Sequence, residues 1–273
     1  MKMQFAVSSW SVHGLLGTAR FAQQGNKTVL SAGQSQGDVS LLQLPAMIAE
    51  AGIHTLEICH FHFPSIEESY LDELKQVLNE NGVTLENILI DAGNIANPNG
   101  EERQADIEMA KQWQEITAYL GGKGNRIDCG RERPSPETIT HTVNALKELT
   151  TNADRLGIKV VTENFHQMSR EPDTLIDIMQ KVEHPIGLCV DFGNAEASAD
   201  KFGTIEKLMP YATSIHCKAN YHDNAIDDAD LNRSLSYLKQ ANFQGPITLI
   251  INETENEWEE MMRLKTAVSN QLT

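Results

Sequence analysis

The fold is decided by three short apolar stretches, residues 159–163 (KVVTE), 186–191 (IGLCVD) and 212–216 (ATSIH). Each stretch ends in a side chain that can bind a metal: Glu163, Asp191 and His216. These residues are 28 and 25 positions apart, and each interval is about the length of one strand–helix unit. Three neighbouring strands of a parallel sheet would bring the three side chains together beyond the carboxyl ends of the strands. Open α/β sheets and α/β barrels place their chemistry there.

The rest of the chain repeats the alternation of strand and helix. Further strands are predicted over residues 4–9, 55–60, 85–92, 125–129 and 245–252. Eight such alternations predict a (β/α)₈ TIM barrel rather than a doubly wound sheet. No linker or internal repeat interrupts them, so we expect residues 1–273 to form a single domain. Residues 14–40, rich in Gly, Gln and Ser, are predicted as a loop insertion after the first strand, for which a small hairpin is one option.

Composition narrows the possible partners and compartment. The net charge is −16, so nucleic acid and anionic lipid are unfavourable partners. The apolar runs are too short for a membrane span, and the N-terminus enters a strand without a signal-peptide segment. The four cysteines lie in or beside predicted strands without a C-x-x-C pair, which predicts free thiols and a cytoplasmic protein. Whether the chain forms a homo-oligomer is left open.

The three strand-end side chains have the composition of a transition-metal site. One imidazole and two carboxylates suit Mn²⁺, Zn²⁺, Co²⁺ or Fe²⁺ better than Ca²⁺, which prefers oxygen throughout. The alternative is that each is an ordinary polar residue hydrogen-bonded at a strand end. Three in succession, each at the end of an apolar strand, favour the metal. Glu57, inside the second predicted strand, would need a partner to offset its desolvation.

Three motifs carry a family resemblance: residues 157–164 (GIKVVTEN), 190–194 (VDFGN) and 215–218 (IHCK). In their order and spacing the chain resembles the sugar phosphate isomerase/epimerase family, which has the xylose isomerase-like TIM-barrel fold of the endonuclease IV superfamily. The resemblance covers nearly the whole chain. It implies that Glu163, Asp191 and His216 bind a divalent metal at the barrel mouth. It also implies a small sugar, polyol or sugar-derived substrate.

The eighth strand departs from the family pattern. A glutamate normally completes the metal site there, but the matching position is Ile250. Asn252 lies two residues further on and, because side chains alternate along a strand, points to the same side. Asn252 is therefore the predicted fourth ligand, with Glu253 or a water as alternatives. A second departure is Asn194, where several sugar epimerases of this family have a histidine.

These departures bear on mechanism. Epimerases of the family are thought to use two carboxylates on opposite faces of the substrate, and Ile250 removes the second. An isomerisation with one base, or a dehydration, remains open, with Glu163 as the base. Lys218 could stabilise an oxyanion, and His62 could move the proton. The residues predicted to contact substrate are Trp10, His13, His60, Arg131, Asn164, His166 and Asn194.

Three functions compete at this stage. The first is a metal-dependent isomerase or epimerase. The second is a sugar-binding or regulatory barrel with a degenerate metal site, suggested by Ile250 and Asn194. The third is an abasic-site endonuclease, which shares the fold, but the acidic composition argues against it.

Overall fold

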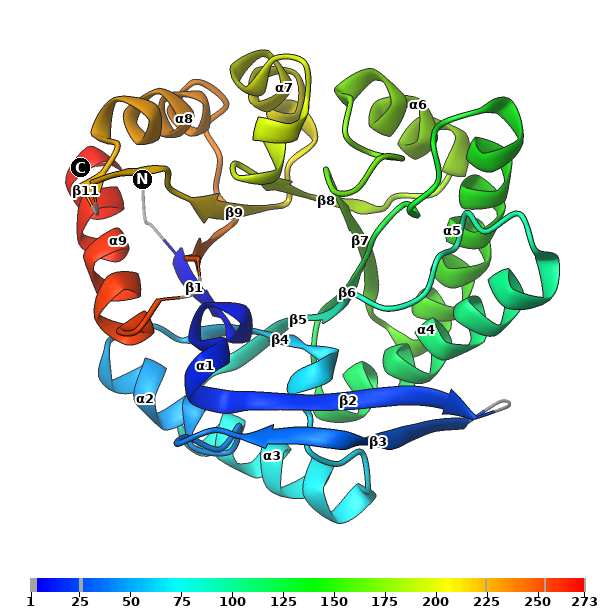
Figure 1. Ribbon diagram of the computed structural model, residues 1–273, viewed down its shortest axis with the longest axis horizontal. Helices are drawn as coiled ribbons and strands as arrows, with labels where there is room; N and C mark the ends of the chain where they lie inside the picture. The colour runs from blue at the N-terminus through cyan, green and yellow to red at the C-terminus, as the bar shows by residue number, and fades with distance from the viewer. Residues whose placement is uncertain (1–3, 25–26, 224, 253, 273) are drawn as a thin grey trace.

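The computed structural model describes residues 4–24, 27–223, 225–252 and 254–272, and for residues 18–36 only the backbone. Over these ranges eight parallel strands close into a barrel (Figure 1). The barrel strands in chain order are β1 (Gln4–Ser8), β4 (Thr55–Cys59), β5 (Thr84–Ile90), β6 (Gly124–Ile127), β7 (Lys159–Glu163), β8 (Gly187–Asp191), β9 (Ser214–Lys218) and β12 (Pro246–Ile250). The barrel closes where β12 pairs with both β9 and β1. The predicted (β/α)₈ barrel is confirmed.

Helices surround the barrel on its outer side (Figure 1). They are α2 (Leu44–Glu50), α3 (Glu68–Glu80), α4 (Gly100–Leu120), α5 (Pro136–Leu156), α6 (Pro172–Val182), α7 (Lys201–Leu208), α8 (Asp228–Gln240) and α9 (Glu257–Leu272). Among the helices of the described residues, none combines the length and apolar character needed to cross a bilayer.

Local sequence signals explain where these helices begin and end. The Ser135 hydroxyl accepts a hydrogen bond from the Thr138 N–H at the start of α5, and the Thr138 hydroxyl accepts one from the Ser135 N–H. The same helix ends at Gly157, whose φ of 73° is in the left-handed region that glycine adopts without strain. Between the ends, apolar side chains such as Leu146 and Leu149 are fully buried against the barrel. The helices are therefore held mainly by their apolar faces.

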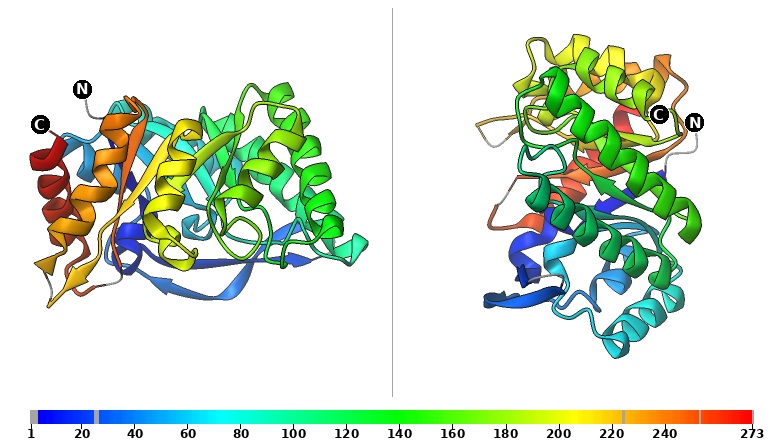
Figure 2. Two further views of the ribbon diagram at one scale, coloured as in Figure 1. Left: turned by 90° about the horizontal axis from the view of Figure 1, so that it is seen from above. Right: turned by 90° about the vertical axis from the view of Figure 1, so that its right-hand side faces the viewer.

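The predicted insertion after the first strand is an antiparallel hairpin. The 3₁₀ helix η1 (Ser9–Val12) and the short helix α1 (His13–Leu16) follow β1 and lead into β2 (Gly17–Gln24), which pairs with β3 (Lys27–Gln36). The hairpin lies on the same side of the barrel as α1, beyond the carboxyl ends of the strands (Figures 1 and 2). It packs beside η2 (His60–His62), the 3₁₀ helix that follows β4.

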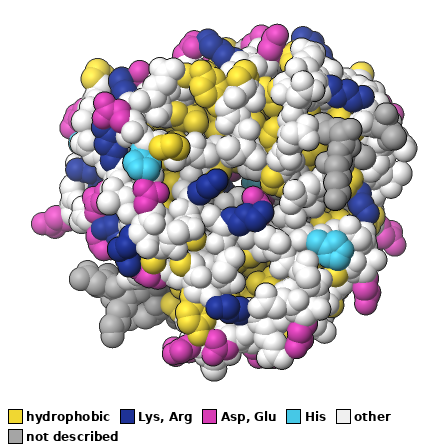
Figure 3. All heavy atoms as spheres, turned by 180° about the vertical axis from the view of Figure 1, so that it is seen from behind, with side chains coloured by type: hydrophobic (Ala, Val, Ile, Leu, Met, Phe, Trp, Pro, Cys, Tyr) yellow, Lys and Arg dark blue, Asp and Glu magenta, His cyan; other side chains and the backbone are white. Residues whose placement is uncertain are grey.

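Smaller elements complete the connections between the strands. They are η3 (Asn194–Ala197), η4 (Met209–Tyr211) and a two-stranded sheet of β10 (Tyr221–His222) and β11 (Ala225–Ile226). On the opposite face, at the amino ends of the strands, Lys and Arg side chains lie beside a central hollow (Figure 3). A cavity at that end is lined by Lys123, Asp154, Lys159 and His184, among others.

Candidate active site

A cavity of about 290 Å³ opens at the carboxyl ends of the barrel strands. Its charged and titratable lining comes from five different strands and the loops that follow them. These side chains are Asp91, Arg126, Arg131, Glu163, His166, Asp191, His216 and Lys218. The wall also includes Trp10, Phe61 and Phe165. A concave site that combines aromatic walls with a few convergent polar groups is typical of small-molecule binding.

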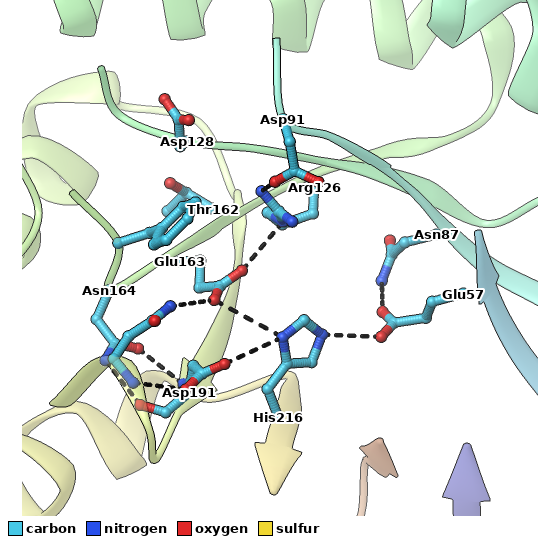
Figure 4. A network of polar contacts seen from close by, with 12 residues as sticks. Glu57, Asn87, Asp91, Arg126, Asp128, Thr162, Glu163, Asn164, Asp191 and His216 are labelled. Carbon is cyan, nitrogen blue, oxygen red and sulfur yellow. Dashed lines mark hydrogen bonds and ion pairs between the residues drawn. The ribbon is translucent and has the colours of Figure 1, made fainter. Parts of the chain in front are cut away.

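The three predicted metal ligands converge in this cavity (Figure 4). His216 Nδ1 lies 3.7 Å from Glu163 Oε1 and 3.5 Å from Asp191 Oδ2, and all three side chains are buried. The strand register explains why the side chains of Asp191 and His216 lie close together, because these residues are Cα partners on β8 and β9. Strand ends that are far apart in sequence thus supply neighbouring side chains.

The other nitrogen of His216 is anchored by Glu57. Nε2 lies 2.9 Å from Glu57 Oε2, while Asn87 Nδ2 donates to Glu57 Oε1 at 2.7 Å. Burial raises the pKa of Glu57, but His216 and Asn87 outweigh it and hold that pKa below its usual value. With Nε2–H directed at this carboxylate, the lone pair of Nδ1 faces Glu163 and Asp191. A carboxylate behind a histidine is the usual support of a metal-binding imidazole.

Negative charge dominates the surroundings of His216. Burial alone lowers the pKa of this imidazole, but Cys189, Glu163 and Glu57 raise it well above its ordinary value. The site therefore favours a cation at Nδ1.

Cys189 joins this group and was missed as a ligand in the sequence. The ligand atoms of Glu163, Cys189 and His216 all lie within 4.8 Å of one another. Cys189 precedes Asp191 by two positions on β8, so strand alternation places both on the inner face. That alternation is the signal that could have identified it. Burial raises the pKa of the thiol to about 11, so carboxylate and imidazole remain the better donors.

Arg126 was also missed, and it modifies the site. Its Nη1 lies 2.6 Å from Asp91 Oδ1, and its Nε lies 3.0 Å from Glu163 Oε2. The contact with Glu163 is an ion pair without hydrogen-bond geometry, so Oε2 is buried with no hydrogen-bond partner among the described residues. An arginine inside a predicted strand, where charged side chains are rare, was the available signal.

Two asparagines hold the ligands in place. Asn194 donates from Nδ2 to Glu163 Oε1 at 2.7 Å and from its backbone N–H to Asp191 Oδ1 at 2.7 Å. Asn164 is buried and exchanges two hydrogen bonds with the backbone of Asp191. Asn194 lines the cavity, whereas Asn164 does not. Asn164 joins the ends of β7 and β8 and lines an adjoining pocket instead of the main cavity, so its predicted substrate contact stays a prediction.

The predicted fourth ligand is not brought to the other three. Asn252 is exposed and does not line the cavity, whereas Ile250 does, as a side chain only 5% exposed. The barrel strand β12 ends at Ile250, so strand alternation no longer governs the direction of Asn252. Glu253, the alternative ligand, lies outside the described residues.

The remaining predicted residues divide into two groups. Trp10, Arg131, His166 and Lys218 line the cavity. His13, His60 and His62 do not line it.

His62, predicted as a catalytic residue, is buried in a chain of hydrogen bonds beside the cavity. Its Nδ1 contacts Ser9 Oγ at 2.7 Å, and its Nε2 contacts His13 Nδ1 at 2.9 Å. Burial, with smaller effects from His13 and His60, lowers the pKa of His62 to about 3. It is therefore neutral at physiological pH, and both ring nitrogens are occupied.

The donor set fits a divalent cation. Glu163 Oε2 is a buried carboxylate oxygen without a hydrogen-bond partner among the described atoms, and His216 presents Nδ1 to the other oxygen of the same carboxylate, Oε1. Asp191 adds a second carboxylate. Arg126 opposes the cation by placing a positive charge next to Glu163.

A closed parallel barrel with carboxylates and an imidazole gathered at its carboxyl end defines the class: a (β/α)₈ barrel with a candidate metal centre. The xylose isomerase-like TIM barrel family matches residues 45–267, and the chain belongs to that family. The family resemblance of the three motifs is thereby confirmed. No curated protein sequence matches the chain.

Solved structures share the fold at low sequence identity. The apo 3-keto-D-glucoside 4-epimerase from E. coli has a TM-score of 0.68 and 16% identity, covering 84% of this chain and 94% of its own. The D-psicose 3-epimerase from Clostridium cellulolyticum with D-tagatose has a TM-score of 0.67 and 14% identity, covering 99% and 97%. A xylose isomerase-like TIM barrel protein from Mycobacterium smegmatis in complex with magnesium has a TM-score of 0.66 and 14% identity, covering 100% and 98%.

Proposed function

We propose that this protein is a divalent-metal-dependent isomerase or epimerase acting on a small sugar, polyol or sugar-derived substrate. One observation carries the proposal: Glu163, Asp191 and His216 converge in the cavity, and Glu57 anchors the far side of His216. Structural neighbours that are sugar epimerases add support. The four free, buried cysteines fit the predicted cytoplasmic location.

Glu163, Asp191 and His216 would hold the metal. When bound, a divalent ion at this position supplies Lewis-acid polarisation of a substrate carbonyl or hydroxyl oxygen. Glu163 would remove and return a proton on the carbon beside that oxygen, and Arg126 and Asn194 orient its carboxylate. Lys218 has no ion pair among the described residues and would donate a hydrogen bond to the developing oxyanion.

The aromatic wall would bind the sugar ring. Trp10 is 43% exposed and lines the cavity next to Phe61, with the two ring centroids 6.3 Å apart. Apolar C–H faces of a sugar pack well on such rings. Arg131 and Asn194, which line the cavity, would contact hydroxyl groups of the substrate.

Ile250 favours isomerisation over inversion. Inverting a carbon requires a proton-carrying group on each face of the substrate, and the apolar end of β12 provides none. Aldose–ketose isomerisation moves a hydrogen between two neighbouring carbons. One base can serve both carbons, and Glu163 would be that base. A dehydration would begin with the same deprotonation and is the related alternative.

The test is turnover by the metal-loaded protein. Aldoses, ketoses and inosose-type compounds are assayed with added Mn²⁺ or Co²⁺. We expect interconversion of at least one pair that is lost in Glu163→Gln. A folded, metal-loaded protein that converts none of these compounds would contradict the proposal.

A non-catalytic sugar-binding barrel is the second candidate. The Arg126 contact with Glu163 favours it, because a guanidinium can take part of the charge-balancing role of a metal. Elemental analysis separates the two. Less than about a tenth of an equivalent of metal after reloading, with polyol binding retained, would favour the binder.

A further inference from the structure

We propose that His166, held by Asp128, is the second proton-carrying group of the reaction proposed above. It would move a proton between two substrate oxygens while Glu163 serves the carbon atoms. This inference rests on the proposed function. The proposed reaction needs a second proton-carrying side chain besides Glu163. The end of β12 does not supply a carboxylate for this role, because Ile250 occupies that position.

The backbone of His166 is held in an unusual conformation. Its φ is 53°, in the left-handed region that residues other than glycine rarely adopt. Among the described non-glycine residues with positive φ, His166 alone lines the cavity. Strained backbone that persists at a ligand cavity often places a side chain needed for function.

The ring of His166 is fixed on two sides. Phe165 stacks on it, with ring centroids 3.8 Å apart and an interplanar angle of 28°. His166 Nε2 lies 3.6 Å from Asp128 Oδ2, which is an ion-pair distance for a protonated ring. Nδ1 has no partner among the described residues and remains for the substrate.

Asp128 is a buried carboxylate with only one of its two oxygens in a hydrogen bond to a described residue. It is 4% exposed, and its Oδ1 accepts a hydrogen bond from the Gly130 N–H at 2.9 Å. Its Oδ2 has no hydrogen-bond partner in the described part of the chain. Among the residues drawn in Figure 4, no ion pair or hydrogen bond joins Asp128 to the network around Glu163. A buried carboxylate aimed at an imidazole is the arrangement that orients a histidine and stabilises its charged form.

Charged groups around the pair come from several elements. Burial raises the pKa of Asp128, and Arg126 on β6 and His166 lower it in part. Arg170 and Glu196 line a second pocket that adjoins the main cavity. His166 lines both of them. Glu196 is paired with Lys201, so its charge is largely balanced.

Other titratable groups of the cavity are less suitable. Asp91 and Arg126 neutralise each other, and burial raises the pKa of the Cys59 thiol to about 12. A lysine such as Lys218 is ordinarily protonated near neutral pH and can donate but not accept. Imidazole can do both in this range.

The protons balance in the proposed cycle. Glu163 takes the proton from the carbon beside the carbonyl, and the electron pair forms an enediolate whose oxygen Lys218 would stabilise. In a separate, later step protonated His166 gives its proton to that oxygen. His166 then takes the proton of the neighbouring hydroxyl as the new carbonyl forms. Glu163 returns its proton to the carbon of the former carbonyl. Both side chains end as they began, and no co-reactant is consumed.

The test compares product formation with hydrogen exchange in the Mn²⁺-loaded protein in D₂O, with D-fructose and D-tagatose as probes. His166→Asn is the main variant, because asparagine tolerates the left-handed conformation. We expect isomer formation to fall by about 100-fold, while deuterium incorporation into the recovered ketose falls much less, since Glu163 is intact. Added imidazole should partly rescue His166→Gly.

Asp128→Asn tests the positioning role. We expect kcat to fall by about 10-fold at an unchanged KM. The pH limb set by His166 should move to lower pH, because the carboxylate that stabilises the charged ring is gone. His184→Asn is the matched control, since His184 pairs with Asp154 at 3.0 Å at the other end of the barrel. It should leave both rates unchanged.

The inference is overturned if His166→Asn keeps full isomerisation, if it lowers exchange and product formation equally, or if His184→Asn has the same effect. NMR of the ring nitrogens of His166 decides the pairing without turnover: the Nε2 signal should change in Asp128→Asn and stay unchanged in His184→Asn. If the wild-type protein neither exchanges nor converts any ketose, the proposed function fails. In that case an unchanged Nε2 signal of His166 in Asp128→Asn overturns the pairing as well.

Discussion

At the residue scale, the candidate site depends on charged groups whose partners come from other strands. Glu57 on β4 reaches His216 on β9, and Arg126 on β6 reaches Asp91 and Glu163. Each contact offsets the desolvation of a buried charge, which would otherwise be strongly unfavourable. Side chains that contact the predicted ligands from behind, such as Glu57 and Arg126, therefore determine how those ligands are oriented.

Replacing Glu57 tests that layer. Glu57→Gln keeps the shape but removes the charge behind His216, so we expect divalent-metal affinity to fall by about 10- to 100-fold. Competition with a chromogenic chelator measures the change. Glu86→Gln is the control, because Glu86 pairs with Lys123. Equal affinity in wild type and Glu57→Gln would show that the carboxylate does not support a metal ligand.

His62 gives the fold a specific pH dependence. Burial lowers its pKa to about 3, whereas in the unfolded chain it is near 6.5, so below pH 6.5 the unfolded state binds a proton that the folded state does not. This contribution to stability is full above pH 6.5 and is lost as the pH falls toward 3. We expect it to remove about 2 kcal/mol of unfolding free energy between pH 7 and 5. Urea unfolding at both pH values should show a smaller loss in His62→Gln, and an equal loss would refute the assignment.

At the scale of elements, β12 is the strand at which this chain departs from the four-ligand metal site of the family pattern. Ile250 is the Cα partner of Lys218 and lines the cavity, so a carboxylate at this position would have both a cation and the metal site nearby. The insertion of residues 14–40, for which the sequence already suggested a small hairpin, contains the paired strands β2 and β3.

Restoring the carboxylate should strengthen the metal site. We expect Ile250→Glu to raise divalent-metal affinity by about 10-fold, with a loss of about 1–3 kcal/mol in stability without metal, because a charge replaces a buried apolar group. Isothermal titration with Mn²⁺ and thermal unfolding measure the two effects. Ile250→Gln provides the uncharged comparison. Unchanged affinity in Ile250→Glu would place the metal elsewhere.

At the scale of the whole molecule, a metal that binds only the folded barrel must stabilise it. At about 100 times its Kd a bound ion adds about 2.7 kcal/mol, which corresponds to a rise of about 5–10 °C in the melting temperature of a domain of this size. We expect this rise with Mn²⁺ and its loss in Asp191→Ala. An Asp191→Ala protein that keeps the full rise would refute the ligand assignment.

The sequence by itself determined the barrel, its alternating elements, the insertion and the three polar side chains at strand ends that are proposed as metal ligands. Those features follow from local periodicity, because the position of a side chain at a strand end depends on the strand alone. The tertiary structure decided the rest. It placed Glu57, Arg126 and Asp128 beside partners on other elements, left Asn252 exposed beyond the end of β12, and buried His62 in hydrogen bonds to Ser9 and His13 beside the cavity. Such contacts depend on which strands become neighbours and in what register, which no short stretch of sequence encodes.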